Sequence, residues 1–295
     1  MTDCDMESKT EAIVQPNKAM PATGVEVSGP ACPGMRSPAG LTESLAERAR
    51  YTRQTVSGAD SPFSLEFCPR LKRMFESRVV ETSDGKTAPF EAGSTVNNIQ
   101  ILRHLVMALR PTRTLEIGLA HGASALTFLT SLREINAGGG DFLHTAIDPF
   151  QRTVWKSAAL HAIAVDGFRD HFQFHDEESS IALPRLCDEH REFQLIYIDG
   201  SHLFEDVFLD FAFTARLLPI GGLCLFDDCS DRHVQKVIRF IKTNYRDVLR
   251  RYPLEGLVKK PLLKRLANRI GFYQLAAFEK IAQTPRKWDS AFTSF

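Results

Sequence analysis

The sequence predicts an α/β protein built on a doubly wound, mostly parallel sheet with an N-terminal helical extension. Two features carry this prediction. After Pro111, short apolar segments alternate with helical stretches, as in parallel βαβ units. The apolar segments are continuous, as in Phe193–Ile198, which is typical of strands covered on both faces. A chain of 295 residues that is 43% hydrophobic can bury such a core without disulfides or metals.

The first 95 residues divide into two parts. Residues 1–40 contain no aromatic residue and five prolines, so they bury too little apolar surface to offset the entropy of ordering. We therefore predict a disordered tail there. Residues 41–95 are predicted to form a helical or cap extension, with a helix over Leu41–Ser57.

The remaining residues, 96–295, are predicted to form the main domain. It opens with a helix over Val96–Leu109, whose apolar side chains form one stripe and which Pro111 ends. The predicted strands are Thr114–Ile117, Phe142–Ile147, Phe172–Phe174, Phe193–Ile198 and Leu223–Phe226. The helices between them are Ala123–Leu132, Thr153–Ala164, Ile181–His190 and Leu203–Leu218. A helix over His233–Leu249 and a strand over Phe272–Phe278 complete the domain.

Composition and charge exclude several classes of protein. Lys plus Arg and Asp plus Glu number 36 each, so the net charge gives no general case for nucleic-acid binding. No run of about 18 apolar residues is present, so we expect no membrane span. The acidic N-terminus lacks the apolar stretch of a signal peptide, and the six cysteines show neither CxxC pairs nor zinc spacing. We therefore expect a cytoplasmic protein with reduced thiols.

A glycine turn follows the first predicted strand. Glu116, Gly118 and Gly122 give the pattern E-x-G-x-x-x-G, in which glycine permits a tight turn and a close approach of a ligand to the backbone. Ala120 replaces the second glycine of the dinucleotide fingerprint G-x-G-x-x-G. This difference favours a nucleoside ligand without a pyrophosphate, although a purely structural turn is the alternative.

Polar residues also follow the next two strands. Asp148 ends the second strand, where a carboxylate can accept hydrogen bonds from both hydroxyls of a ribose. Glu178 and Ser179 follow the third strand and can reach an adenine amino group. The alternative for this second pair is a solvated acidic helix start.

Three carboxylates follow the fourth and fifth strands. Asp199 ends the fourth, and Asp227 and Asp228 end the fifth. Since these strand ends can be neighbours, the carboxylates are expected to converge, and oxygen ligands suit a hard cation such as Mg²⁺. The alternative is that the aspartates cap helices.

His202 lies three residues beyond Asp199, where the chain turns into the next helix. A neutral imidazole can accept a proton near pH 7, so His202 is the candidate general base. The competing interpretation is a structural histidine that is hydrogen-bonded in a turn.

Together these motifs resemble those of the class I S-adenosylmethionine-dependent methyltransferases. The resemblance rests on the glycine turn, Ile147-Asp148-Pro149, Asp199-Gly-Ser-His202, Gly221-Gly222 and Phe226-Asp227-Asp228. It is strongest to the small-molecule O-methyltransferase branch, which includes metal-dependent catechol-type and macrolide-sugar enzymes, and it covers roughly Val96 to Lys280.

The resemblance implies a seven-stranded sheet whose last strand is antiparallel, although Tyr252–Val258 is a poor candidate for the sixth strand. It implies S-adenosylmethionine as cofactor, held by Glu116, Gly118, Gly122, Asp148, Glu178, Ser179 and Asp199. It also implies Mg²⁺ on Asp199, Asp227 and Asp228, with His202 as the base.

We therefore expect O-methylation of a small-molecule hydroxyl, assisted by a divalent metal. The expected partner is that small-molecule acceptor rather than nucleic acid, and the sequence also allows a homo-oligomer. Three alternatives stay open: a metal-independent methyltransferase on another acceptor, a non-catalytic nucleoside-binding protein of the same fold, and a nicotinamide-dependent dehydrogenase. The glycine spacing speaks against the last of these.

Overall fold

The computed structural model describes residues 64–91, 94–254, 257, 274–283 and 289–295. All of them belong to a compact unit, Thr42–Phe295, whereas the second unit, Met1–Leu41, lies outside the described residues. The helix predicted over Leu41–Ser57 lies outside them as well. The disordered tail therefore stays a prediction.

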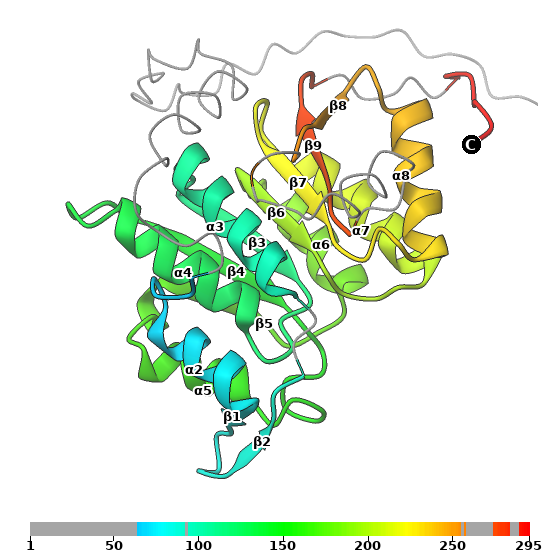
Figure 1. Ribbon diagram of the computed structural model, residues 1–295. Helices are drawn as coiled ribbons and strands as arrows, with labels where there is room; N and C mark the ends of the chain where they lie inside the picture. The colour runs from blue at the N-terminus through cyan, green and yellow to red at the C-terminus, as the bar shows by residue number, and fades with distance from the viewer. Residues whose placement is uncertain (1–63, 92–93, 255–256, 258–273, 284–288) are drawn as a thin grey trace, which may run out of the picture. The chain divides into compact units, whose positions relative to one another are not determined.

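A seven-stranded sheet forms the centre of this unit (Figure 1). Its strand order is β5-β4-β3-β6-β7-β9-β8, and β9 runs in the direction opposite to that of the other six strands. This confirms the predicted doubly wound, mostly parallel sheet. The strands are β3 Arg113–Ile117, β4 Leu143–Ile147, β5 Phe172–His175, β6 Leu195–Ile198, β7 Leu223–Phe226, β8 Leu249–Tyr252 and β9 Ala276–Lys280.

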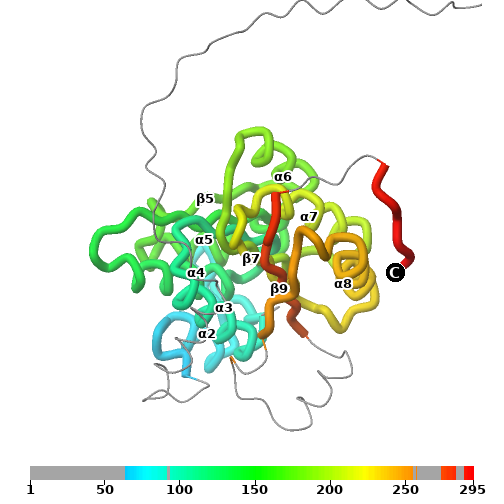
Figure 2. The backbone as a smooth tube through the Cα atoms, turned by 90° about the horizontal axis from the view of Figure 1, so that it is seen from above, coloured from blue at the N-terminus to red at the C-terminus, as the bar shows by residue number. Residues whose placement is uncertain are grey.

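Helices cover both faces of the sheet, and each face has its own apolar cluster. Figure 2 shows the two groups of helices on either side of the strands. One group is α2 Pro69–Ser77, α3 Val96–Leu109, α4 Ala123–Ile135 and α5 Ala158–Val165, and the other is α6 Ser179–Asp188, α7 Phe204–Leu217 and α8 Arg232–Asn244. A small antiparallel hairpin, β1 Val79–Glu81 and β2 Thr87–Pro89, and a short 3₁₀ turn, η1 Arg169–His171, complete the elements.

The register of the parallel strands determines where the functional residues stand. Ile117 pairs with Ile147 on β4 and with Ile198 on β6, and Ile198 pairs with Phe226 on β7. The next residue of each strand therefore falls in one row across the sheet. Since neighbouring strands lie about 4.8 Å apart, this row is compact. In order across the sheet, the row is Asp148, Gly118, Asp199 and Asp227.

The structure corrects two predicted helix boundaries. The helix predicted from Thr153 begins at Ala158, because Lys156 and Ser157 have φ angles of 50° and 55°, a left-handed conformation that a helix does not accept. The helix predicted over His233–Leu249 ends at Asn244. Leu249, the last residue of the predicted helix, instead begins a strand.

That strand, β8, is the sixth of the sheet along the chain, and it ends at Tyr252, where the poor candidate Tyr252–Val258 begins. It pairs antiparallel with β9 over Leu249–Tyr252. Pro253 has no N–H group to add to the ladder, which explains why the strand precedes it. None of the helices among the described residues combines the length and the apolar character that crossing a membrane requires.

A buried carboxyl lies where α6 packs against α7. Asp210 on α7 is almost completely buried, and its Oδ1 has no hydrogen-bond partner. Burial raises the pKa of Asp210 to about 7, the hydroxyl of Ser179 opposes this rise, and the nearby Asp206 adds to it. Folding therefore favours the protonated form of Asp210.

We predict that Asp210→Asn stabilises the protein at pH 8 and has little effect at pH 4. A carboxyl whose pKa is raised in the folded state favours folding below its unfolded pKa near 4, and that contribution is lost as the pH rises through about 7. The gain at pH 8 is at most about 4 kcal/mol. Urea unfolding at both pH values measures it, with the exposed Asp188→Asn as control. A gain that does not depend on pH would contradict this account.

Candidate functional site

The glycine turn after β3 is held by close backbone contacts. Gly118 has a φ of 91°, and a Cβ atom added there would lie 2.1 Å from the backbone carbonyl oxygen of Asp199. Gly122 has a φ of 82°, and its Cβ would lie 2.9 Å from Cβ of Ala159. Both positions therefore require glycine, and the turn brings bare backbone to the carboxyl edge of the sheet.

Asp148 shapes this turn from the neighbouring strand. Its Oδ2 accepts hydrogen bonds from the backbone N–H groups of Leu119 (3.1 Å) and Ala120 (2.8 Å) and from the side-chain amide of Gln151 (3.2 Å). Its Oδ1 accepts one hydrogen bond, from the N–H of Phe150 at 2.7 Å. Oδ1 therefore keeps a lone pair for a further donor.

A cavity of about 450 Å³ lies over this edge of the sheet. Five of the residues predicted to hold a nucleoside line it: Gly118, Asp148, Glu178, Ser179 and Asp199. The lining residues that were not predicted include Phe150, which is 54% exposed, Trp155, Asp206 and Leu209.

A second cavity of about 240 Å³ adjoins the first and shares Gly118, Ala120, Trp155, Asp199 and Gly200 with it. Gly122 lines the second cavity and not the first, and the same is true of Ser94, His121, His202 and Asp228. The glycine turn thus borders both cavities, and His202 belongs to the second.

Two polar residues near the turn have structural partners. Glu116 is completely buried, with Oε1 3.2 Å from Nε2 of His144, and it lines neither cavity. It therefore supports the strand end from beneath. His121 has its Nδ1 within hydrogen-bond distance of the backbone of Glu91, and burial lowers its pKa, so its ring is neutral at pH 7.

The acidic rim formed by Asp199, Asp227 and Asp228 is centred on Asp227. This side chain is buried, and its two oxygens accept from four donor groups. Asn98 Nδ2 bonds both oxygens, at 3.0 and 2.8 Å, and the Tyr197 hydroxyl bonds Oδ2. Gln274 Nε2 (2.9 Å) and the backbone N–H of Asp228 (2.7 Å) bond Oδ1.

Asp199 connects to this centre through two hydroxyls. Ser94 Oγ lies 3.2 Å from Asp199 Oδ2 and 3.0 Å from the oxygen of Tyr197. The three contacts that join Asp199, Ser94, Tyr197 and Asp227 need three hydrogens, and the two hydroxyls supply only two. Burial, followed by the charges of Asp227 and Asp228, raises the pKa of Asp199 well above its ordinary value. A protonated Asp199 supplies the third hydrogen.

His202 pairs with the remaining carboxylate. Its Nε2 lies 2.8 Å from Oδ2 of Asp228, and its side chain is 53% exposed. Gln274 Nε2 holds the other oxygen of Asp228 at 2.5 Å. The predicted base and a predicted metal ligand are therefore brought into direct contact.

The rim does not have the arrangement of a metal centre. In the part of the chain that the structure describes, no three His, Cys, Asp or Glu side chains are placed to hold one ion together. A carboxylate offers about four lone-pair positions, and protein donors already occupy those of Asp227. As arranged, these residues do not fit the expected Mg²⁺.

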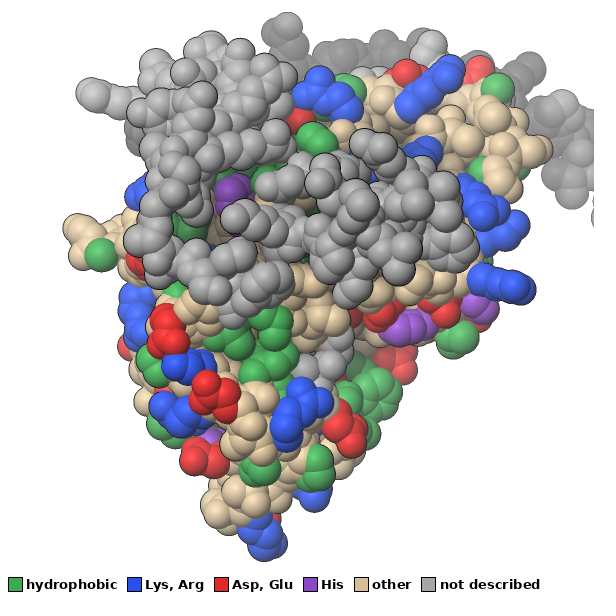
Figure 3. Space-filling model, viewed as in Figure 1, with side chains coloured by type: hydrophobic (Ala, Val, Ile, Leu, Met, Phe, Trp, Pro, Cys, Tyr) green, Lys and Arg blue, Asp and Glu red, His purple; other side chains and the backbone are tan. Residues whose placement is uncertain are grey.

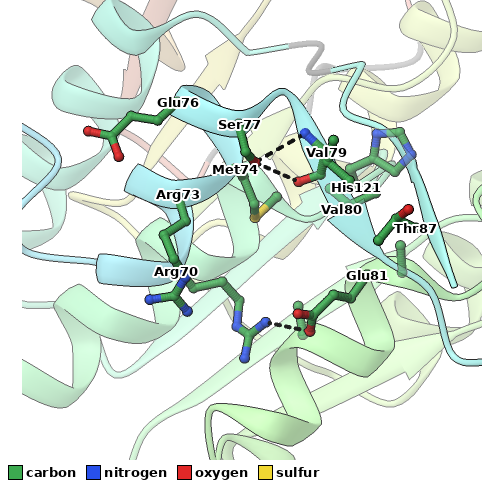
Figure 4. Close-up of a pocket in the computed structure, with 12 residues that line it drawn as sticks. Arg70, Arg73, Met74, Glu76, Ser77, Val79, Val80, Glu81, Thr87 and His121 are labelled. Atoms are coloured by element: carbon green, nitrogen blue, oxygen red, sulfur yellow. Dashed lines mark hydrogen bonds and ion pairs between the residues drawn. The ribbon is translucent and has the colours of Figure 1, made fainter. Parts of the chain in front are cut away.

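A third cavity, of about 380 Å³, lies between α2, the β1–β2 hairpin and α5, and shares His121 with the second (Figure 4). Arg70 points across it to Glu81, 3.5 Å away, and is also 2.7 Å from Asp166. Basic and acidic side chains are mixed over this part of the surface (Figure 3). The cavity therefore has no dominant charge that would indicate a ligand.

The comparisons with known proteins agree with the fold. Residues 115–229 match the model of a family described as a methyltransferase domain. No protein of curated function matches the chain by sequence. The matched residues include the glycine turn and the three rim aspartates.

Several solved structures share the fold. A candidate O-methyltransferase from Klebsiella pneumoniae is 18% identical, with a TM-score of 0.50 over 81% of this chain and 97% of its own. The cofactor-bound protein Rv0187 from MTB is 15% identical, with a TM-score of 0.52 over 81% and 98%. An O-methyltransferase from Bacillus cereus in complex with SAH is 15% identical, with a TM-score of 0.50 over 79% and 96%. Identities this low establish a common fold and leave the substrate open.

We predict that Gly118→Ala destabilises the protein by about 2–5 kcal/mol. This is the sum of the cost of a left-handed φ for alanine and the cost of the backbone shift that the new Cβ would force. Gly85→Ala is the matched control, because Gly85 has a φ of 77° and nothing within 4 Å of an added Cβ. It should lose only about 1–2 kcal/mol. Equal losses in urea unfolding would show that the approach to Asp199 does not constrain the turn.

Proposed function

We propose that this chain is an S-adenosylmethionine-dependent methyltransferase that methylates a hydroxyl group of a small molecule. The observation that carries the proposal is the row Asp148, Gly118 and Asp199 beneath the 450 Å³ cavity. The adjoining cavity contains His202. The two cavities thus meet at the glycine turn, within the residues that match a family described as a methyltransferase domain.

The larger cavity suits the nucleoside part of the cofactor. Asp148 Oδ1 has a lone pair for one ribose hydroxyl, because its Oδ2 is used by the turn. Phe150 offers an exposed aromatic face for the adenine, and Glu178 and Ser179 offer polar atoms beside it. Gly118 has no Cβ, so the methionine part of the cofactor can approach the backbone there.

The smaller cavity suits the acceptor, because it joins the glycine turn to His202. When bound, S-adenosylmethionine supplies a sulfonium methyl group that is transferred to oxygen while the C–S electron pair stays on sulfur. The chain itself aligns the hydroxyl with that methyl group and removes the proton. His202 accepts the proton from the acceptor hydroxyl as the new O–C bond forms.

No step of this proposal uses a divalent cation, because the rim aspartates as arranged do not fit one. The cavity of about 240 Å³ accommodates the hydroxyl-bearing end of a small molecule. Transfer of labelled methyl from S-adenosylmethionine to a panel of phenols and sugars tests the activity directly.

We predict that Asp148→Ala weakens binding of S-adenosylhomocysteine by about 1.5–3 kcal/mol, the value of a charge-assisted hydrogen bond. The loss has two sources, the ribose contact and the turn amides that Asp148 holds. Calorimetry measures the affinity, with the exposed Asp170→Asn as control. Unchanged affinity in folded Asp148→Ala would remove this residue from the site.

We predict that His202→Ala lowers the rate of methyl transfer by about 10²–10⁴, the usual contribution of a general base. Affinity for S-adenosylhomocysteine should be nearly unchanged, because His202 does not line the larger cavity. Rates are compared on whichever hydroxyl compound the wild type methylates. A variant that keeps most of the wild-type rate would show that another group takes the proton.

A further inference from the structure

Hydrogen-bond donors of the protein stabilise the carboxylate at the centre of the acidic rim. Five contacts from Asn98, Tyr197, Gln274 and the backbone of Asp228 surround the carboxylate of Asp227. The amides of Asn98 and Gln274 must present nitrogen here, because only their NH₂ groups can donate to a carboxylate. A cation on Asp227 would have to displace buried hydrogen bonds and leave their donors unpaired, which is costly.

The residue after Asp227 has an unusual backbone conformation. Asp228 has a φ of 48°, a left-handed conformation that is strained for a residue with a side chain. Strain of this kind is retained where the surroundings determine the conformation, and it concentrates at functional sites. Here the conformation accompanies a contact between Asp228 Oδ2 and Nε2 of His202 at 2.8 Å.

We propose that methyl transfer by this chain requires no divalent metal, and that Asp228 is a positioning residue that orients His202. This inference rests on the proposed function. Asp227 then belongs to the scaffold, where Asn98 from α3 and Gln274, two residues before β9, hold its carboxylate. Gln274 also bonds Asp228, so the scaffold and the positioning carboxylate are fixed together.

The contact with Asp228 assigns the two ring nitrogens of His202. A carboxylate is an acceptor, so Nε2 of neutral His202 carries the hydrogen and donates it to Asp228. Nδ1 then keeps its lone pair, and His202 lines the cavity assigned to the acceptor. The proton leaves the acceptor oxygen for Nδ1, and the imidazolium that forms is stabilised by the carboxylate on its other side.

Metal binding gives the first test, and it needs no acceptor. The full chain, saturated with S-adenosylhomocysteine, is titrated with Mn²⁺ and followed by water-proton relaxation. We expect no saturable site tighter than about 1 mM. One stoichiometric site that is lost in Asp227→Asn and kept in Asp170→Asn would overturn the proposal.

The tautomer of His202 gives the second test. In ¹⁵N-histidine-labelled protein, with the resonance assigned by His202→Gln, we expect the Nε2–H form in the wild type and in Asp170→Asn. Asp228→Ala should give a mixture of both forms. An Nδ1–H form in the wild type, or a tautomer that does not respond to Asp228→Ala, would contradict the orienting role.

The third test uses any hydroxyl compound that the enzyme methylates. Asp228→Asn should lower kcat about 10–100-fold and leave KM nearly unchanged, as expected for loss of an orienting partner. Treatment of the wild type with EDTA should leave kcat unchanged, and loss of activity restored by Mg²⁺ would overturn the proposal. The proposed function and this inference can fail separately. Absence of S-adenosylhomocysteine binding would contradict the proposed function. Binding of S-adenosylhomocysteine together with a Mn²⁺ site at the rim would contradict only this inference.

Discussion

The in-register pairing of the four central parallel strands is the constraint on which the site depends. The last residues of β4, β3, β6 and β7 pair in register. The residues that follow them therefore form a row across the edge at the spacing of neighbouring strands: Asp148, Gly118, Asp199 and Asp227. A slip of one residue in any strand would turn these side chains to the other face. Gly118 stands between two acidic residues and has no side chain, so the row has room for a ligand over its middle.

The same row brings two carboxylates close enough to repel each other, because Asp199 and Asp227 follow adjacent strands and are shielded from solvent. The repulsion between two such carboxylates can be reduced in two ways. One is a bound cation, and the other is a set of hydrogen-bond donors together with one proton on the pair. Tyr197, Asn98 and Gln274 supply the donors, and the hydrogen count through Ser94 places a proton on Asp199. With Asp227 satisfied in this way, Asp228 is free to hold His202.

Sequence reasoning could predict the parts of the site that depend on where strands end. Asp199 and Asp227 each follow a continuous apolar strand, Asp148 follows a strand that ends in apolar residues, and parallel strands bring such ends to one edge. It could not predict the donors around Asp227, because Asn98 lies 129 residues away on a helix and Gln274 follows no pattern. The available signal was the position of Asn98, four residues before Leu102 and therefore on the apolar stripe of its helix. The errors at Ala158 and β8 arose from left-handed residues and long-range antiparallel pairing, which periodicity does not register.

A crystal structure of the full chain with S-adenosylhomocysteine tests the central claim most directly. The account predicts the adenosyl group in the 450 Å³ cavity, with a ribose hydroxyl on Asp148 Oδ1 and the sulfur beside Gly118, facing the cavity that contains His202. An empty cavity at saturating ligand, or a ligand bound away from the row Asp148, Gly118 and Asp199, would contradict it.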